Sequence, residues 1–407
     1  MRVVAAMIGI LFLLPGHIRG QDVSELLARM KSMEARIQTL EAEVRALRGK
    51  PEAPAPLTAS TDPQVRSAEP LPGVQLAPGP QLPYYGGQAA AAKIFNPDLS
   101  VIGTFLGAAG NPRVRPGPSF QMRETEVALQ AIVDPYARAD FFLSFGHQGV
   151  ELEEGYLTFP ALPGGFQAKA GKMRAAFGRV NTMHLDTLPW TDRPLVTQNL
   201  LGGEEGISDA GLAVSRILPA PGGVFLEGAG QFYRLFGSER RSDVLAVGRL
   251  RGFRDVSEST NVDLGFSFGH GSSPEVPSPA LRLYGMDATV RWKPLRRAIY
   301  RSFIGRTELV WARAAQPEET ARAFGYYVSG EYQFGRRWSA GARFDRSERY
   351  ERLLRDTGGS LLLTYRPSEF SQLRGQLRRT RYGERVTANE LLFQLQFSLG
   401  VHGAHPF

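Results

Sequence analysis

Apolar and polar residues alternate through most of the chain from Ile94 onward. One segment sets four apolar residues against polar or small neighbours: Val262, Leu264, Phe266 and Phe268 alternate with Asn261, Asp263, Gly265 and Ser267. Successive side chains of a β-strand point to opposite faces of the sheet. A period of two therefore predicts strands that each have one apolar and one polar face.

About sixteen such segments follow one another, with turn residues between them. Their predicted ranges are 94–106, 119–134, 136–147, 149–160, 164–174, 207–218, 223–236, 243–256, 260–271, 280–294, 299–315, 322–335, 336–348, 357–367, 370–382 and 386–399. Short turns alternate with longer loops along this series. Aromatic residues stand near several strand ends: Tyr136, Phe159, Trp292, Trp311, Trp338 and Tyr365.

A water-soluble β-sandwich would show the same alternation, but its strands usually have about 5–6 residues. A tilted strand that crosses a bilayer needs about 9–11 residues, and the segments here are of that length or longer. An even strand number, unequal loops and aromatic belts are typical of bacterial outer-membrane barrels. We therefore predict an all-β fold, a transmembrane antiparallel β-barrel, over residues 93–407. The terminal Phe407 predicts that the barrel-assembly machinery recognises the last strand.

The first residues have the pattern of a secretory signal peptide. Arg2 precedes an apolar run from Val3 to Leu14, and Pro15 and Gly16 interrupt it. The run is too short to cross a membrane as a helix. We therefore predict that residues 1–20 are a signal peptide and that the mature chain reaches the outer membrane of a Gram-negative cell.

A heptad pattern follows over residues 21–49, and it predicts a coiled-coil helix for self-association. Its seam consists of Val23, Leu26, Met30, Met33, Ile37, Leu40, Val44 and Leu47. These residue types leave two-stranded and three-stranded assembly open, and packing of the helix on its own barrel is the alternative. Residues 50–92 contain nine prolines, which predicts an extended linker.

The formal net charge is +8, and only six of the 48 basic residues are lysines. Arginine can hold carboxylate or phosphate through two parallel hydrogen bonds, although codon choice in a GC-rich genome would give the same bias. The basic residues are spread along the strands rather than clustered, which disfavours nucleic-acid binding. The chain has no cysteine, so disulfides and thiolate metal sites are excluded.

The segment from Ala175 to Gly206 is the most informative connection. It contains Leu185, Leu188, Trp190, Leu195, Leu200 and Leu201. Folding it into the barrel would bury these side chains and narrow the pore, whereas packing on a neighbouring subunit is the alternative. The residues predicted at the constriction or lumen are Lys169, Lys172, Arg174, Arg179, Asp186, Asp192, Arg193, Arg138, Arg306 and Arg343. Strand parity adds the lumen charges Glu124, Glu126, Asp140, Arg291, Glu308, Asp345, Arg374 and Arg378.

The order of signal peptide, heptad helix, Pro-rich linker and barrel resembles the phosphate-selective porin O and P family. The motifs that carry the resemblance are residues 123–133, 136–145 and 154–157, and residues 171–179 with a basic-x-x-Phe-Gly turn into a long loop. The resemblance implies a trimeric porin whose constriction loop and basic residues select anions such as phosphate. Asp186, Asp192, Glu204 and Glu205 in the same loop oppose anion selectivity, so we expect only a mild preference.

These features predict an outer-membrane porin that sits in the lipid bilayer as a homo-oligomer and passes small anionic solutes without a cofactor. The alternative is a structural barrel tethered to other envelope components by a periplasmic coiled coil. An enzyme is disfavoured, because the G-x-S-x-G match at residues 265–269 lies inside an alternating strand, whereas the hydrolase motif needs a strand-to-helix turn. The six histidines show no paired zinc spacing, so no metal site is predicted. A TonB-dependent receptor is also disfavoured, because such a receptor has a plug domain before the barrel and no segment of that size precedes the predicted strands.

Overall fold

The computed structural model describes residues 97–400, except 113, 148, 236–237, 239, 273–279, 316–319 and 351–353. The predicted signal peptide, heptad helix and linker, together with Phe407, lie outside these residues and stay predictions. No helix in the described part of the chain has the length and apolar character needed to cross a membrane.

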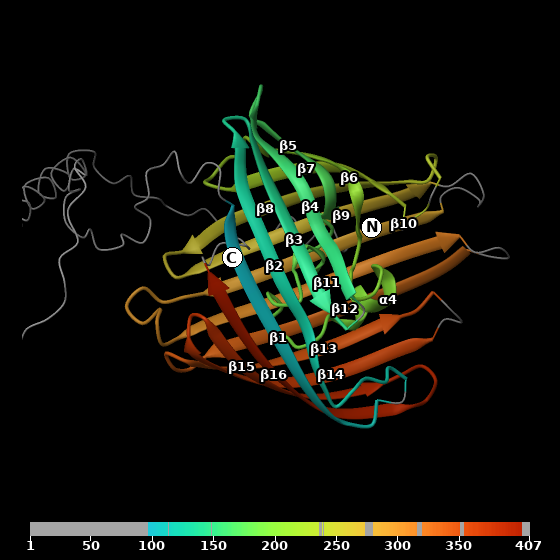
Figure 1. The fold of residues 1–407 in the computed structure, drawn as a ribbon, viewed down its shortest axis with the longest axis vertical. Coiled ribbons are helices and arrows are strands. Elements are labelled where there is room, and N and C mark those ends of the chain that lie inside the picture. Colours follow the sequence, from blue (N-terminus) through green and yellow to red (C-terminus); the bar gives the residue numbers. More distant parts are fainter. Residues whose placement is uncertain are drawn as a thin grey trace, which may run out of the picture. The chain divides into compact units, whose positions relative to one another are not determined.

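Sixteen antiparallel strands close into one barrel, in which sequence neighbours pair and β1 pairs with β16 (Figure 1). The strands are β1 (Asp98–Gly110), β2 (Phe120–Asp134), β3 (Ala137–Gly146), β4 (Gly149–Leu162), β5 (Phe166–Arg174), β6 (Ser208–Leu218), β7 (Phe225–Arg234), β8 (Val244–Ser257), β9 (Thr260–Ser272), β10 (Leu281–Trp292), β11 (Ser302–Ala315), β12 (Thr320–Gln333), β13 (Trp338–Glu348), β14 (Arg355–Ser368), β15 (Ser371–Arg381) and β16 (Thr387–Gly400). The predicted antiparallel barrel of sixteen strands is thus confirmed. Predicted and observed positions differ most for the first strand, which is predicted over 94–106 and observed over Asp98–Gly110.

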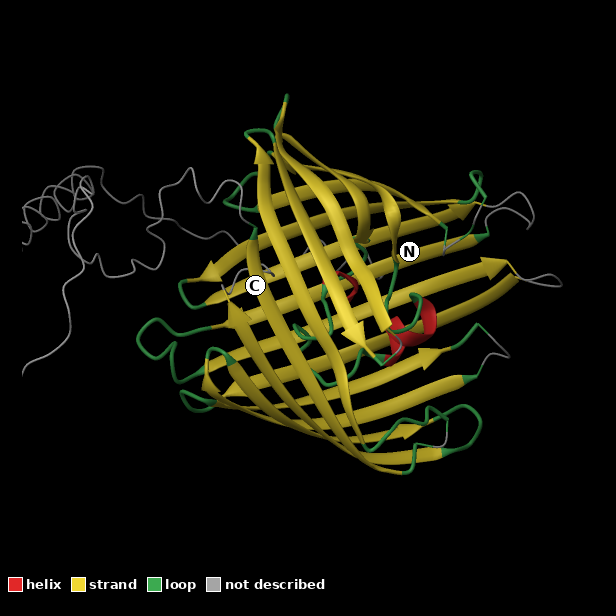
Figure 2. Cartoon of the chain, in the orientation of Figure 1, coloured by secondary structure: helices red, strands yellow, loops and turns green. Residues whose placement is uncertain are grey.

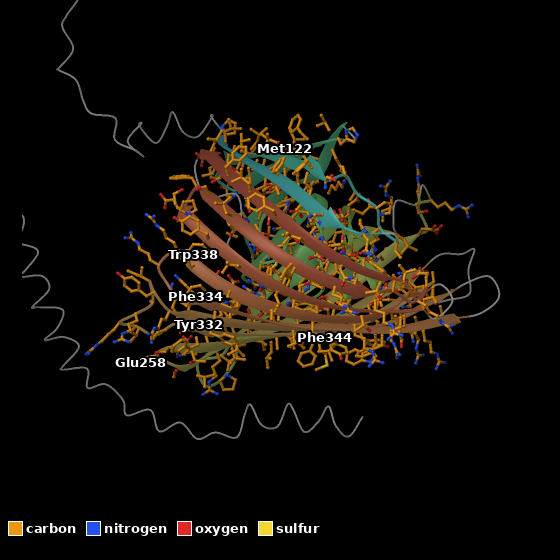
Figure 3. The ribbon with its side chains drawn as sticks, turned by 90° about the horizontal axis from the view of Figure 1, so that it is seen from below. Met122, Glu258, Tyr332, Phe334, Trp338 and Phe344 are labelled. Carbon is orange, nitrogen blue, oxygen red and sulfur yellow. The ribbon has the colours of Figure 1, made fainter. Side chains whose placement is uncertain are left out.

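The alternating pattern sets the two faces of the wall. In β14, Leu361 and Leu363 point outward and are 62% and 48% exposed, whereas the intervening Leu362 points inward and is buried. Outward aromatic residues such as Tyr332, Trp338 and Phe344 stand along the outer surface (Figure 3). An apolar outer band with aromatic side chains is the surface that a bilayer requires of a barrel.

Two strands on one side of the barrel carry an extra residue. The pairing of β2 with β1 skips Arg123, and the pairing of β4 with β3 skips Glu153. Such β-bulges interrupt the alternation of side chains and re-aim them locally. As a result, the charged pairs Arg123–Glu124 and Glu153–Glu154 can all make contacts on the lumen side.

Candidate functional site

The connection between β5 and β6, residues 175–207, folds into the barrel and is mostly buried (Figure 2). It contains a 3₁₀ turn, η1 (Val180–Thr182), and a short helix, α4 (Leu195–Leu200). We name this segment the inner loop. Its buried apolar residues are Phe177, Val180, Leu188, Trp190, Val196, Leu200 and Leu201, and they pack on inward residues of the wall such as Leu245, Leu283, Val310 and Tyr327. The apolar composition of the inner loop thus predicts its inward position correctly.

Glycines in the wall receive the side chains of the inner loop. A Cβ atom at Gly285 in β10 would lie 2.9 Å from the Phe177 ring, and one at Gly325 in β12 would lie 2.9 Å from Val196. Side chains at these two positions would therefore displace the inner loop. The Phe-Gly pair of the basic-x-x-Phe-Gly motif is thus the point where the inner loop begins its contact with the wall.

Gly178 follows Phe177 with a left-handed backbone, φ +62°, and its amide donates to the Ser267 hydroxyl at 3.0 Å. A Cβ atom here would lie 1.6 Å from Glu308 Oε1. Ser267 also accepts from Arg249 at 3.0 Å. Ser267, the serine of the G-x-S-x-G match, lies within strand β9. It therefore holds the inner loop in place through its hydrogen bond with Gly178.

We expect Gly178→Ala to loosen the inner loop, because the new Cβ meets both backbone strain and Glu308. Left-handed strain and overpacking together amount to about 2–4 kcal/mol. Trypsin should then cleave folded, detergent-solubilised protein at Arg179 or Arg193, which the parent protects. Gly165→Ala is the matched control, because Gly165 has φ +74° but nothing within 4 Å of an added Cβ. Equal protection of both variants would contradict the expectation.

The far end of the inner loop is held by ion pairs with β13 and β15. Asp192 accepts from Arg343 at 2.9 Å and from Arg378 at 2.8 Å, and Arg343 also binds Asp345 at 2.7 Å. The Arg343 guanidinium lies over the Trp190 ring, 4.9 Å from its centroid. Burial alone would raise the pKa of Asp192, but the two guanidinium groups hold this pKa well below its usual range. Asp192 is therefore charged at neutral pH.

At another point of the wall, His184 joins the inner loop to β2 and β4. Its Nδ1 lies 2.8 Å from Glu126 and its Nε2 lies 2.7 Å from Glu154, and the Phe142 ring packs against it at 5.0 Å. Burial alone would lower the pKa of His184, but hydrogen bonds with Glu126, Glu153 and Glu154 hold this pKa well above its usual range. The ring therefore carries a proton on both nitrogens in this arrangement.

Two of the predicted constriction residues stabilise the inner loop itself. Arg193 is 1% exposed and donates to the backbone carbonyls of Val180, Met183 and Glu204. Arg174 donates to the Glu205 carbonyl and to the Glu153 carboxylate. Both side chains are therefore occupied by contacts within the inner loop and with β4, and their role at the constriction stays a prediction.

The remaining predicted residues are spread over the lumen wall. Lys169 lies over the Tyr156 ring at 4.4 Å, and Lys172 pairs with the exposed Glu151 at 3.2 Å. Arg138 pairs with Asp140 at 2.6 Å, with about half of its side chain exposed.

A cavity of about 580 Å³ lies between the inner loop and the end of the barrel where the connections are short. Four arginines border it, namely Arg306, Arg336, Arg366 and Arg374, together with the acidic residues Asp186, Glu331 and Glu369. We name this cavity the vestibule. Arg374 also donates to the Leu188 carbonyl at 2.9 Å, so the inner loop forms the floor of the vestibule. Beside it, Arg179 of the inner loop lies 3.7 Å from Asp263.

The sequence interpretation missed Arg123, Glu153 and His184. Arg123 donates to the Thr191 carbonyl and pairs with Glu204 at 3.3 Å. For Arg123 and Glu153 the sequence does carry a signal. Two consecutive charged residues interrupt the alternating pattern at 123–124 and again at 153–154. For His184 the sequence carries no such signal, because a single histidine in a loop is common.

Comparison with known proteins places the fold among outer-membrane channels. An anion-selective porin from Comamonas acidovorans superposes with a TM-score of 0.53 and 9% identity, covering 74% of this chain and 99% of that one. The outer membrane channel DcaP of Acinetobacter baumannii has a TM-score of 0.50 and 9% identity, covering 75% and 96%. OprB of Pseudomonas putida has a TM-score of 0.50 and 10% identity, covering 76% and 95%. At these identities the likeness concerns the fold alone.

No protein-family model matches the chain, so the resemblance to the phosphate-selective porin O and P family stays a prediction. In sequence, an uncharacterized protein of Aquifex aeolicus (strain VF5) is 30% identical over 336 residues, which cover 71% of this chain and 70% of the relative. Identity at this level over most of both chains indicates common descent and a common fold. The chain therefore belongs to the same family as this Aquifex aeolicus protein.

Proposed function

We propose that the protein is an outer-membrane porin through which small solutes diffuse passively, with a mild preference for anions such as phosphate. The main support for this proposal is the inner loop. The loop crosses a closed sixteen-stranded barrel and forms the floor of a vestibule that is bordered by arginines. In this proposal the protein works as a trimer and without a cofactor. The known channels of the same fold, one of them named as anion-selective, support it.

The charges that border the vestibule support selective passage. Arg306, Arg366 and Arg374 stand on β11, β14 and β15 and Arg336 in the turn between β12 and β13, and Asp186, Glu331 and Glu369 border the same cavity. Opposed charges across a narrow water-filled passage create a transverse field that orients and filters ions. The excess of arginine at the vestibule favours anions there.

Neutralising two vestibule arginines should lower the anion preference. At about 8 Å in water, a unit charge contributes about 0.5 kcal/mol to an ion, so removing two raises the free energy of an anion by about 1 kcal/mol and lowers its permeability about fivefold. We expect Arg306→Gln combined with Arg366→Gln to shift the reversal potential of single channels in a KCl gradient in the direction of lower anion selectivity. Arg379→Gln is the control, because Arg379 is exposed and lies outside the vestibule. An unchanged reversal potential in the double variant would argue against selection at the vestibule.

A second candidate function is that of a structural barrel with a closed lumen. It is favoured by contacts of the inner loop all around the wall, from Glu126 in β2 through Glu308 in β11 to Arg378 in β15. Planar-bilayer recordings separate the two candidates. Stepwise conductance of the unaltered protein supports the porin, whereas its absence together with conductance after removal of the inner loop supports the structural barrel.

A further inference from the structure

Four glutamates and one histidine meet where the inner loop touches β2 and β4. Glu124 and Glu126 come from β2, Glu153 and Glu154 from β4, and His184 from the inner loop. The bulge at Glu153 allows two consecutive glutamates of one strand to join the cluster. Nδ1 of His184 lies 2.8 Å from Glu126 Oε2 and 3.2 Å from Glu153 Oε2. We call these five residues the glutamate cluster.

The glutamate cluster brings four carboxyl groups together, and His184 and Arg174 are cationic side chains among them. Arg174 contributes one guanidinium, 2.7 Å from Glu153, and its backbone amide donates to Glu154. Glu124 is 5% exposed and its carboxyl group lies against that of Glu153. Neither oxygen of Glu124 meets a hydrogen-bond donor among the described residues. A buried carboxylate without a donor is unfavourable by several kcal/mol unless a cation or proton accompanies it.

The spacing of the donor atoms is that of a metal's coordination shell. One oxygen each of Glu126 and Glu153 and a nitrogen of His184 lie within 4.8 Å of one another. With metal–ligand bonds of about 2.1 Å, adjacent ligands of an octahedron lie about 3.0 Å apart. His184 Nδ1 lies 2.8 Å from Glu126 Oε2 and 3.2 Å from Glu153 Oε2, and these two distances lie on either side of that value.

We propose that the glutamate cluster binds one divalent first-row transition-metal ion such as Mn²⁺. His184 Nδ1 and one carboxylate oxygen each of Glu126 and Glu153 are its ligands, and Glu124 lies beside Glu153. Carboxylates together with an imidazole suit Mn²⁺, Fe²⁺ or Zn²⁺ better than Ca²⁺, which takes oxygen ligands. Binding displaces the proton on Nδ1 to solvent, because a ligating imidazole is neutral.

The surroundings of His184 match those of metal-bound histidines. Such a ring usually donates its other N–H to a carboxylate, and here Nε2 lies 2.7 Å from Glu154. Glu154 in turn accepts from the Arg174 backbone amide, and Phe142 covers one side of the ring. The ion would join the inner loop to β2 and β4, so metal availability would set how firmly the loop is held. This role is independent of what the barrel transports.

Manganese binding to the purified full-length protein tests the proposal. After chelator treatment and exchange into detergent buffer, Mn²⁺ is titrated and the free ion is followed by its electron paramagnetic resonance signal. We expect one saturable site per chain. Glu126→Gln should remove saturable binding, and Glu154→Gln, which alters the partner of Nε2 and of the Arg174 amide but no ligand, should weaken it by about 10–100-fold.

Glu151→Gln is the matched control. Glu151 lies on the same strand as Glu153 and Glu154, but it is exposed and pairs with Lys172. It should bind Mn²⁺ as the parent does. Retention of the compact, heat-modifiable band in gel electrophoresis shows that each variant is folded. The proposal is overturned if the unaltered protein shows no saturable binding, if Glu126→Gln binds equally well, or if Ca²⁺ competes as strongly as Zn²⁺. Conductance is measured separately, so failure here leaves the porin proposal standing.

Discussion

A variant in which a short Gly-Ser linker replaces residues 180–205 should conduct several times more current per open channel than the unaltered protein. The inner loop occupies the lumen from β2 to β15, and a barrel of sixteen strands without it would enclose a wide aqueous channel. The charged residues that the loop now contacts, such as Glu308 and Arg343, would then be hydrated. Single-channel recordings in planar bilayers measure the change.

A matched replacement of residues 219–223, the turn between β6 and β7, should leave the conductance unchanged. This turn lies outside the inner loop, so it controls for the effect of a linker on barrel assembly. If the loop variant and the parent carried equal current, the inner loop would not be the constriction. Circular dichroism with the β-barrel signature verifies that both variants are folded.

Arg343→Met should lower the free energy of unfolding by about 3–5 kcal/mol, the usual effect of removing one partner from a buried ion pair. The Arg343 side chain is 1% exposed and binds both Asp192 and Asp345. Its loss removes the ion-pair partner of Asp345 and leaves Asp192 paired with Arg378. Urea unfolding in lipid vesicles, followed by tryptophan fluorescence, measures the loss, because Trp190 lies against the same guanidinium.

Two further variants separate the ion pair from simple truncation. Arg379→Met removes an exposed arginine of β15 and should change stability by less than about 0.5 kcal/mol. Adding Asp345→Asn to Arg343→Met removes the unpaired charge, so it should restore part of the loss, and the double-mutant cycle gives the coupling energy. If Arg343→Met were as stable as Arg379→Met, the ion pairs would not hold the inner loop.

The contacts of the inner loop explain why the basic-x-x-Phe-Gly motif is informative. Phe177 enters the space left by Gly285, and Gly178 approaches Glu308 more closely than any side chain would permit. The motif therefore marks a docking point between a loop and a wall more than a hundred residues further along the chain.

The sequence by itself determined the strands and their inward and outward faces, and it favoured inward folding of residues 175–206. These features follow from periodicity and apolar content, which act locally: each residue's face depends on its neighbours, and an apolar loop must be buried somewhere. The predicted strand positions differ from those observed by a few residues. Lumen charges such as Arg306 and Arg343 were found by the same parity.

Only the tertiary structure decided which charges meet. Arg193 turns into the inner loop to bind carbonyl groups, and His184 reaches Glu126 and Glu154 across the lumen. These contacts depend on the path of the loop and on the bulges at Arg123 and Glu153, each of which shifts the faces of the residues that follow it. Periodicity alone cannot supply them, because it sets the face on which a side chain lies but not the distant residue that the side chain meets.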